Sequence, residues 1–134
     1  MISEVGQIFN DPTLNSLKLV LEVSAKRHDA LASNIANYNT PGYHRVDLSS
    51  NFKNAFSVAL RDLDEGKPAD ELAVTSPQIA VDDKQNIARM DGNTVNLEQE
   101  TTEVIKNQSD FDFAGRLLAL KYSGLRAAIS GTVS

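Results

Sequence analysis

Apolar side chains recur every three or four residues at both ends of this 134-residue chain. A repeat of that kind, kept up over several heptads, predicts a long α-helix with one seam that faces a partner helix. The expected seam positions are Leu14, Leu17, Leu21, Leu31 and Ile35 near the N-terminus and Val104, Phe111, Leu118, Tyr122, Leu125 and Ile129 near the C-terminus. We therefore expect a mainly α fold in which two long heptad helices pair as an antiparallel coiled-coil hairpin.

Capping residues support the helical interpretation at both ends. Asp11 followed by Pro12 is typical of an N-cap and a first helical residue, and Asn96 with Gln99 resembles a capping box. The run Leu17–Val23 also alternates as a strand would. We prefer a helix there, because the cap is favourable and the heptad spacing persists.

The middle of the chain has a less regular pattern. Helical spacing over Phe52–Leu63 predicts a short helix with Gly66 as its stop, and Gln78–Val81 could pair with Asn86–Met90 as a small β-hairpin. We divide the chain into residues 1–46 with the first helix and its end, the irregular middle 47–94, and residues 95–134 with the second helix. All three parts are expected to form one structural unit.

The C-terminal helix carries a second apolar stripe on the side opposite its seam. Its large members are Phe113, Leu117 and Leu120, offset from the seam by about 200° around the helix axis. A helix that is apolar on opposite sides needs a partner on each side. One intrachain helix covers one side, so we expect a neighbouring subunit to cover the other.

Polar and small residues interrupt both seams, at Ser24, His28, Thr101, Gln108 and Gly115. Each weakens packing at a core position, so the isolated hairpin is expected to be marginal and to complete its folding on assembly. His28 is expected to be half-buried with a hydrogen-bond partner rather than catalytic.

Composition and motifs exclude several functional classes. The formal net charge of −5 argues against nucleic-acid binding, which needs a basic surface. The chain has no cysteine, and its two histidines, His28 and His44, lack the spacing of metal ligands. It also lacks a Gly-rich phosphate loop and a nucleophile with a positioned base. We therefore predict no catalytic, cofactor-binding or metal-binding residues, no small-molecule substrate and no enzymatic activity.

The N-terminal helix ends in an unusual run of residues. The run comprises Ser33, Asn34, Ile35, Ala36 and Asn37, followed by Thr40, Pro41, Gly42 and Tyr43. Asn bonds local backbone groups and tolerates the left-handed region, which suits a helix C-terminus. Pro41 prevents the helix from continuing, and Pro41-Gly42 fits the centre of a type II turn. Local chemistry thus accounts for a well-specified helix end.

This run resembles the N-terminal motif of bacterial flagellar axial proteins, the family of rod, hook and hook-associated subunits. Its nine positions have the spacing of that motif and follow a helix of the expected kind. A second block, Met90–Glu100, is similar to the stretch that opens the C-terminal helix in proximal rod subunits of the family. Lys121–Leu125 and Ala127–Ile129 resemble the end of that helix.

The resemblance implies a structural subunit of the proximal flagellar rod, in the part of the basal body that spans the periplasm. It implies export as an unfolded chain by the flagellar type III export apparatus, followed by helical assembly into the drive shaft for motility. The implied partners are copies of itself, other flagellar rod proteins and the adapter protein between the membrane ring and the rod. The resemblance also implies an uncleaved N-terminal export signal, which agrees with the absence from residues 1–7 of the basic and apolar regions of a secretory signal peptide.

Heptad spacing by itself leaves one alternative open, a soluble coiled-coil adaptor or export chaperone. Such a protein would share the long helices. It would have no need of an Asn-rich helix end followed by Pro-Gly, so we favour the rod subunit.

Overall fold

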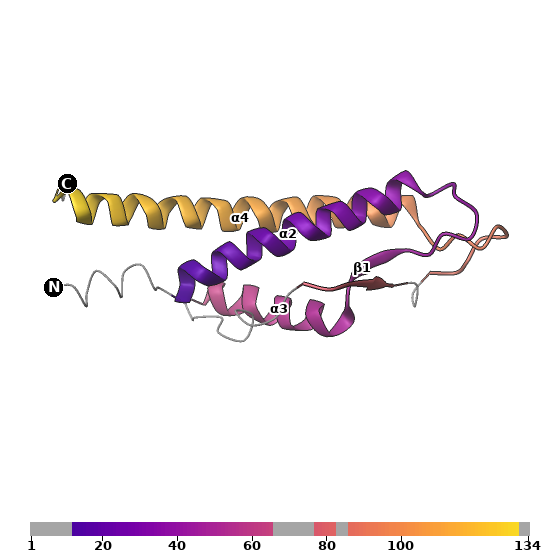
Figure 1. Cartoon of the computed structure of the whole chain (residues 1–134), viewed down its shortest axis with the longest axis horizontal. Helices are drawn as coiled ribbons and strands as arrows, with labels where there is room; N and C mark the ends of the chain where they lie inside the picture. The colour runs from indigo at the N-terminus through magenta and orange to yellow at the C-terminus, as the bar shows by residue number, and fades with distance from the viewer. Residues whose placement is uncertain (1–11, 66–76, 83–85, 132–134) are drawn as a thin grey trace.

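The computed structural model describes residues 12–65, 77–82 and 86–131. Its elements follow in the order α2 (Pro12–Ala36), β1 (Val46–Leu48), α3 (Ser50–Asp64), β2 (Ile79–Val81) and α4 (Leu97–Ser130). Figure 1 shows α2 and α4 packed together and running in opposite directions, with α3 on the other side of α2. This arrangement confirms the predicted mainly helical fold with long N- and C-terminal helices.

The helix boundaries lie close to the predicted ones. α4 begins after Asn96, whose Oδ1 accepts hydrogen bonds from the amides of Glu98 and Gln99 at 3.1 and 3.2 Å. The predicted N-cap is therefore confirmed at this end. α2 begins at Pro12, while Asp11, its predicted cap, lies outside the described residues, as does the predicted stop of α3 at Gly66.

The predicted hairpin between Gln78–Val81 and Asn86–Met90 is wrong. β2 pairs with β1 instead, antiparallel, with Val46 opposite Val81 and Leu48 opposite Ile79. Burial gives the physical reason. Leu48 is 2% exposed and belongs to the core, whereas Ile87 and Met90 are 95% and 108% exposed and would have given a hairpin little to pack on.

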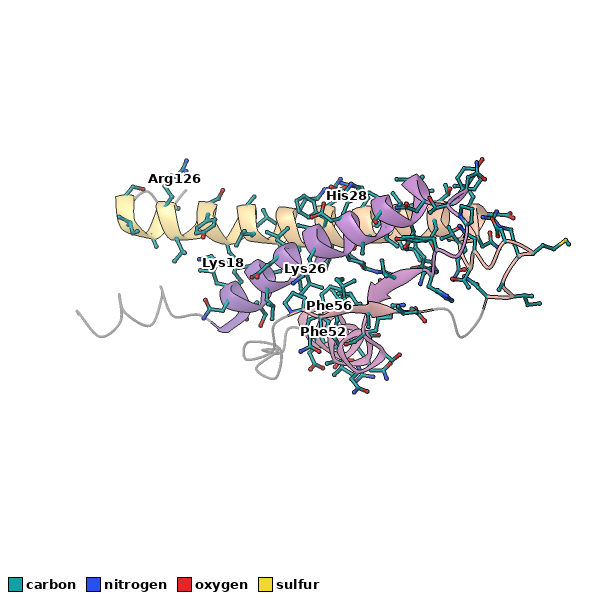
Figure 2. The ribbon with its side chains drawn as sticks, turned by 45° about the vertical axis from the view of Figure 1, so that its right-hand side comes forward. Lys18, Lys26, His28, Phe52, Phe56 and Arg126 are labelled. Atoms are coloured by element: carbon teal, nitrogen blue, oxygen red, sulfur yellow. The ribbon has the colours of Figure 1, made fainter. Side chains whose placement is uncertain are left out.

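The hydrophobic core lies mainly between α2, α3 and β1. It is formed by Leu17, Val20, Val23, Leu48, Phe52, Phe56 and Ala59, with Ala114 from α4. Figure 2 shows Phe52 and Phe56 beneath α2, and their stacked ring centroids are 6.4 Å apart. α2 is therefore packed on two sides, by α3 on one and by α4 on the other.

The buried face of α2 differs in part from the predicted seam. The residues buried here include Leu14, Leu17, Val20, Ser24, Arg27, Leu31 and Asn34, whereas Leu21 and Ile35 are half-buried and His28 is exposed. The prediction of a half-buried His28 is wrong. Arg27 and Asn34 occupy buried positions because their polar groups are hydrogen-bonded there, so apolar spacing did not reveal this face.

α4 also turns a different face to α2 from the predicted one. Its buried residues, Glu100, Asn107 and Ala114, are spaced by seven positions. Within the predicted seam Val104, Leu118 and Leu125 are half-buried, and Phe111, Tyr122 and Ile129 are exposed. As a description of packing within one chain, the seam is wrong at these three exposed positions, because polar side chains make the contact instead. Asn107 Nδ2, for example, donates to the Ser24 carbonyl at 2.8 Å.

The residues of the second apolar stripe differ in how far they are buried. Leu117 packs at the edge of the core, whereas Phe113 and Leu120 are exposed. Figures 1 and 2 show that α2 and α4 are closest where α2 ends and that they diverge toward the start of α2, beyond which α4 extends. Within the described residues, none of the helices combines the length and apolarity that a membrane span requires.

Candidate assembly site

The end of α2 is built by short bonds among the motif residues. Asn37 Nδ2 donates to the Ser33 carbonyl at 2.8 Å, and Thr40 Oγ1 donates to Asn37 Oδ1 at 3.0 Å. The Tyr43 amide then donates to the Thr40 carbonyl at 3.2 Å, which closes a turn with Gly42 at φ +73°. The predicted Pro-Gly turn is confirmed. No Asn among the described residues has a positive φ, so their contribution is side-chain bonding and not left-handed backbone.

A second loop, Asp91–Thr94, docks on this turn through the backbone. The Gly42 amide donates to the Asp91 carbonyl at 2.8 Å, and the Thr94 amide donates to the Tyr43 carbonyl at 3.0 Å. Gly92 has a φ of +81°, and a Cβ added to it would lie 3.5 Å from the Gly42 Cα. This is an ordinary contact distance, so the positive φ of Gly42 and Gly92, and not the approach of the two loops, favours glycine at both positions.

Asn93 completes the contact between the two loops. Its buried Nδ2 donates to the carbonyls of Asn37 and Thr40, at 2.9 and 2.8 Å. These carbonyls lie just beyond α2, where the helix supplies no further donors. The two sequence blocks that resemble flagellar axial proteins thus form one unit, which we call the motif clamp (Asn37–Tyr43 with Asp91–Thr94).

Asn34 connects the motif clamp to β1 and α4. Its Oδ1 accepts hydrogen bonds from the Val46 amide at 3.0 Å and the Tyr43 hydroxyl at 3.1 Å. Its Nδ2 donates to the Val46 carbonyl at 2.7 Å and to Glu100 Oε2 at 3.1 Å. The Tyr43 hydroxyl also lies 3.1 Å from Ser33 Oγ. This fully buried amide therefore makes four hydrogen bonds, its full complement.

A cluster of charged side chains lies beside the clamp, between α2, β1 and α4. This charged cluster consists of Arg27, Arg45, Lys53, Asp47, Asp82, Glu100 and Glu103. Arg27 donates to both carboxylate oxygens of Asp47, at 2.9 and 3.1 Å, and to Glu103 at 2.6 Å. Arg27 thereby ties α2 to both β1 and α4.

Arg45 occupies the centre of the charged cluster and is only 2% exposed. Its guanidinium donates to Glu100, to Asp47 at 3.0 Å and to Asp82 at 3.0 Å. Lys53 from α3 adds ion pairs of 3.0 Å to both aspartates. Buried charges of this kind are tolerated because each has an opposite charge and hydrogen bonds.

The cluster fixes the protonation of Asp47 and Arg27. Burial alone would raise the pKa of Asp47, but the hydrogen bond and charge of Arg27, aided by Lys53 and the Leu48 amide, hold it well below its usual range. Burial likewise opposes the charge on Arg27, yet Asp47 and Glu103 outweigh it and raise the Arg27 pKa. Both groups stay ionised, so the cluster can hold elements together.

Sequence comparison with known proteins places this chain in a protein family. A family model described as flagella basal body rod protein matches residues 24–44. The flagellar basal body rod protein FlgB of Aeromonas hydrophila is 32% identical over 117 residues, which cover 83% of this chain and 87% of that protein. The chain belongs to the FlgB family of flagellar basal body rod proteins.

Other FlgB proteins match over similar lengths. FlgB of Buchnera aphidicola subsp. Acyrthosiphon pisum is 31% identical over 119 residues, covering 80% of this chain and 82% of that protein. FlgB of Salmonella typhimurium is 29% identical over 135 residues, covering 90% of this chain and 95% of that protein. The likeness to FlgB therefore includes both long helices as well as the motif.

The segment matched by the family model, residues 24–44, holds much of the site. It contains Arg27, Asn34 and the first half of the motif clamp, while Asp91–Thr94 lies outside it. In this FlgB-family chain the predicted motif residues are thus brought together with a loop that the sequence analysis had linked to them only by resemblance.

The charged cluster was not predicted from the sequence. Arg45, Asp47 and Glu100 show no periodic apolar pattern that would mark them as buried. One available signal was a spacing of seven, which joins Arg27 to Asn34 in α2 and Glu100 to Asn107 in α4. Polar residues repeated at heptad spacing on facing helices are typical of a buried polar contact.

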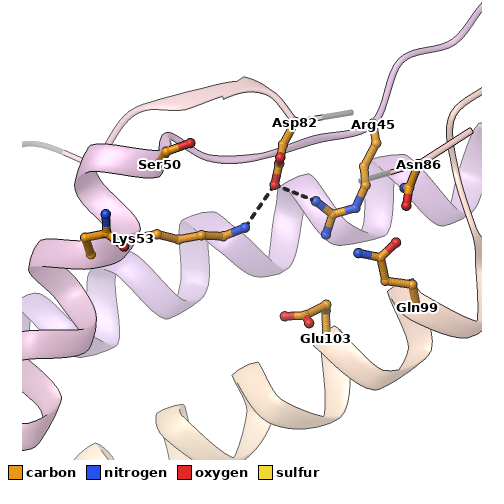
Figure 3. Close-up of a pocket in the computed structure, with 8 residues that line it drawn as sticks. Arg45, Ser50, Lys53, Asp82, Asn86, Gln99 and Glu103 are labelled. Carbon is orange, nitrogen blue, oxygen red and sulfur yellow. Dashed lines mark hydrogen bonds and ion pairs between the residues drawn. The ribbon is translucent and has the colours of Figure 1, made fainter. Parts of the chain in front are cut away.

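A polar hollow of about 260 Å³ opens beside the charged cluster. Figure 3 shows Arg45 and Lys53 reaching the same Asp82 carboxylate across it. These charges are already paired with one another. Among the residues that the structure describes, no group of three His, Cys, Asp or Glu side chains is arranged to hold a metal ion.

Proposed function

We propose that this chain is a subunit of the proximal flagellar rod that is exported by the flagellar type III apparatus and assembles helically with its partners. As a member of the FlgB family, it is a structural component of the flagellar basal body. The proposal adds the export route, the helical mode of assembly and a contact with the adapter protein between the membrane ring and the rod. No catalytic step is assigned to it.

The observation that carries the proposal is the exposed apolar surface of α4. Leu120 and Ile129 are 68% and 71% exposed, and Phe113 and Tyr122 are 40% and 43% exposed. Apolar exposure of this extent on one element is typical of a surface that another protein covers. We assign these residues, together with Phe111 from the predicted seam, to contacts with neighbouring rod subunits.

An in-frame deletion in the source bacterium tests the proposal. We expect the deletion strain to be non-motile and to lack every flagellar structure distal to the membrane ring, with both properties restored by the wild-type gene. Isolated basal bodies viewed by electron microscopy give the readout. Filaments that persist without this chain contradict the proposal and favour the coiled-coil adaptor or export chaperone.

A pair of substitutions at one exposed position tests the assigned surface. Leu120→Glu places a charge where the proposal expects an apolar contact, so we expect export without incorporation into the rod. Leu120→Met keeps the apolar character and is the matched control, expected to support motility. Equal motility of the two variants would argue against an assembly role for this surface.

A further inference from the structure

A groove runs between α3 and α4. It consists of two hollows of about 260 and about 410 Å³, which share the side chains of Lys53, Asn54 and Glu103. Figure 3 shows the first hollow, with Lys53 from α3 and Glu103 from α4 on opposite sides of it. The second continues past Phe56 to Asp110 on α4 and is also lined by Arg27, so the groove has an apolar side on α3, acidic residues on α4, and basic residues that already pair with carboxylates of the charged cluster.

The α4 wall of this groove carries negative charge that the chain leaves incompletely neutralised. Within the described residues, no hydrogen bond or ion pair reaches the Asp110 carboxylate. Burial raises the pKa of Asp110, and although Arg27 lowers it, the nearby Glu103 raises it further, so the net shift is upward. A positive charge brought into this groove would therefore be favourable.

The same helix carries the opposite charge in its second half. From Leu97 to Asp112, α4 contains five acidic residues and one Lys, whereas from Phe113 to Ser130 it contains only Arg116, Lys121 and Arg126 as charged residues. Arg116 and Arg126 are exposed, and Figure 2 shows Arg126 near the C-terminal end of α4. The exposed Leu120 lies about one turn from Arg116. This segment, Phe113–Ser130, is both basic and apolar, as the groove requires.

The groove and the basic segment of one chain cannot meet, because both belong to one continuous helix. Asp110 and Arg126 are held about 24 Å apart along its axis. We propose that the groove between α3 and α4 binds the Phe113–Ser130 segment of a second copy of this chain. The inference rests on the proposed function and specifies the two surfaces that meet. Because these surfaces differ, the contact is heterologous and can repeat from copy to copy into an open assembly.

Charge reversal in two full-length variants tests this contact. Asp110→Lys reverses a charge in the groove, and the double variant Arg116→Glu, Arg126→Glu reverses the charge of the segment. Sedimentation velocity over a concentration series measures association. We expect each variant alone to need a concentration about tenfold or more above wild type for half-association. An equimolar mixture should restore association, because each groove then meets a segment of opposite charge.

Matched controls separate this contact from general effects of charge. Asp112→Lys makes the same charge change at an exposed position of α4 outside the groove, and it should associate as wild type does. Circular dichroism checks that every variant keeps its helices. If Asp110→Lys loses them, Asp110→Asn replaces it, with a smaller increase expected.

Three results would overturn the inference: a wild-type chain that stays monomeric throughout, variants that associate like wild type, or a mixture that fails to associate. None of these results alters the phenotype of the deletion strain. A failure of this inference is therefore distinguishable from a failure of the proposed function.

Discussion

Asn93 joins two parts of the chain that are far apart in the sequence. Its Nδ2 donates to the carbonyls of Asn37 and Thr40, and its Oδ1 accepts from the Val95 amide at 2.8 Å. The side chain is 0% exposed, so water cannot replace these bonds in the folded chain. The docking of the motif clamp therefore depends strongly on one amide.

Substitution Asn93→Ala should lower the free energy of unfolding by about 1–3 kcal/mol, because the buried Val95 amide loses its acceptor and the carbonyls of Asn37 and Thr40 each lose one of two donors. Urea denaturation followed by circular dichroism measures the change. Asn15→Ala, at an exposed position of α2, is the control and should change stability by less than about 0.5 kcal/mol. An unaltered urea midpoint for Asn93→Ala would show that the clamp is not stabilised in this way.

Two Gly→Ala substitutions should act in opposite directions. Gly92→Ala should destabilise by about 1–2 kcal/mol, because the backbone there is left-handed at φ +81°. Gly115 lies within α4, and a Cβ added there meets nothing within 4 Å. Gly115→Ala should therefore stabilise by up to about 1 kcal/mol through helix propensity. The same denaturation measurement checks both variants. Changes of the same sign in their free energies of unfolding would contradict the prediction.

For single residues, the sequence predicts the backbone conformation that each residue type favours at its own position. The Pro41-Gly42 turn could be predicted because Pro fixes its φ and Gly permits a positive one. The partners of Asn34 and Asn93 could not be predicted, because they belong to segments that only the complete fold brings near. Local chemistry specifies the helix end, while the docking of the second loop is a tertiary effect.

Among the elements, β1 has a larger role than its three residues suggest. Asp47 and the preceding Arg45 lie two positions apart and on the same side of the extended chain. From there they reach Arg27 on α2, Glu100 on α4 and Lys53 on α3. Ion pairs from β1 and the adjacent Arg45 therefore connect all three helices.

Replacing Asp47 should reveal this connection. Asp47→Asn leaves Arg27 and Arg45 buried with one carboxylate fewer, so we expect a loss of about 3–5 kcal/mol at pH 7. Asp112→Asn, on the exposed side of α4, is the matched control and should change stability little. Urea denaturation at fixed pH gives both values, and similar losses in the two variants would refute a special role for β1.

The low pKa of Asp47 gives this element a pH dependence of definite sign. An unfolded Asp takes up a proton near pH 3.9, whereas Asp47 in the folded chain stays ionised at that pH. Its contribution to stability is therefore complete above about pH 5 and is lost as the pH falls below the unfolded value. Thermal unfolding between pH 7 and pH 3 should show a fall that is shallower in Asp47→Asn. Parallel curves for the two proteins would contradict this assignment.

Element positions were more predictable from the sequence than element faces. The long helices follow from caps and from spacing that persists over many residues. Their contact face did not follow, because Glu100 and Asn107 are buried through hydrogen bonds and hydrophobicity gives no sign of that. The strand pairing was missed for a related reason, since it depends on Leu48 entering a core built by other elements.

In the molecule as a whole, α2 and α4 are held together at one end and diverge toward the other (Figure 1). The motif clamp and the charged cluster hold the end where α2 stops and α4 starts. Toward the other end, α4 has exposed residues such as Leu120 and Ile129. Stability is therefore expected to differ along a single helix.

Hydrogen exchange followed by mass spectrometry should show this difference. In the free chain we expect α4 amides between Glu100 and Ala114 to exchange most slowly and those beyond Tyr122 to exchange fastest, because the latter have fewer buried contacts. In assembled material the amides beyond Tyr122 should gain protection. Uniform protection along α4 of the free chain would contradict the expected gradient.

The divergence of the two long helices has a mechanical consequence. Because α2 and α4 are held together at one end, a small rotation of one helix about that end produces a larger displacement at its other end. α2 is about 37 Å long, so a rotation of about 5° at the joint moves its far end by about 3 Å. The far ends of the two helices can thus adjust their separation by ångströms at the cost of small angular changes where they are fastened.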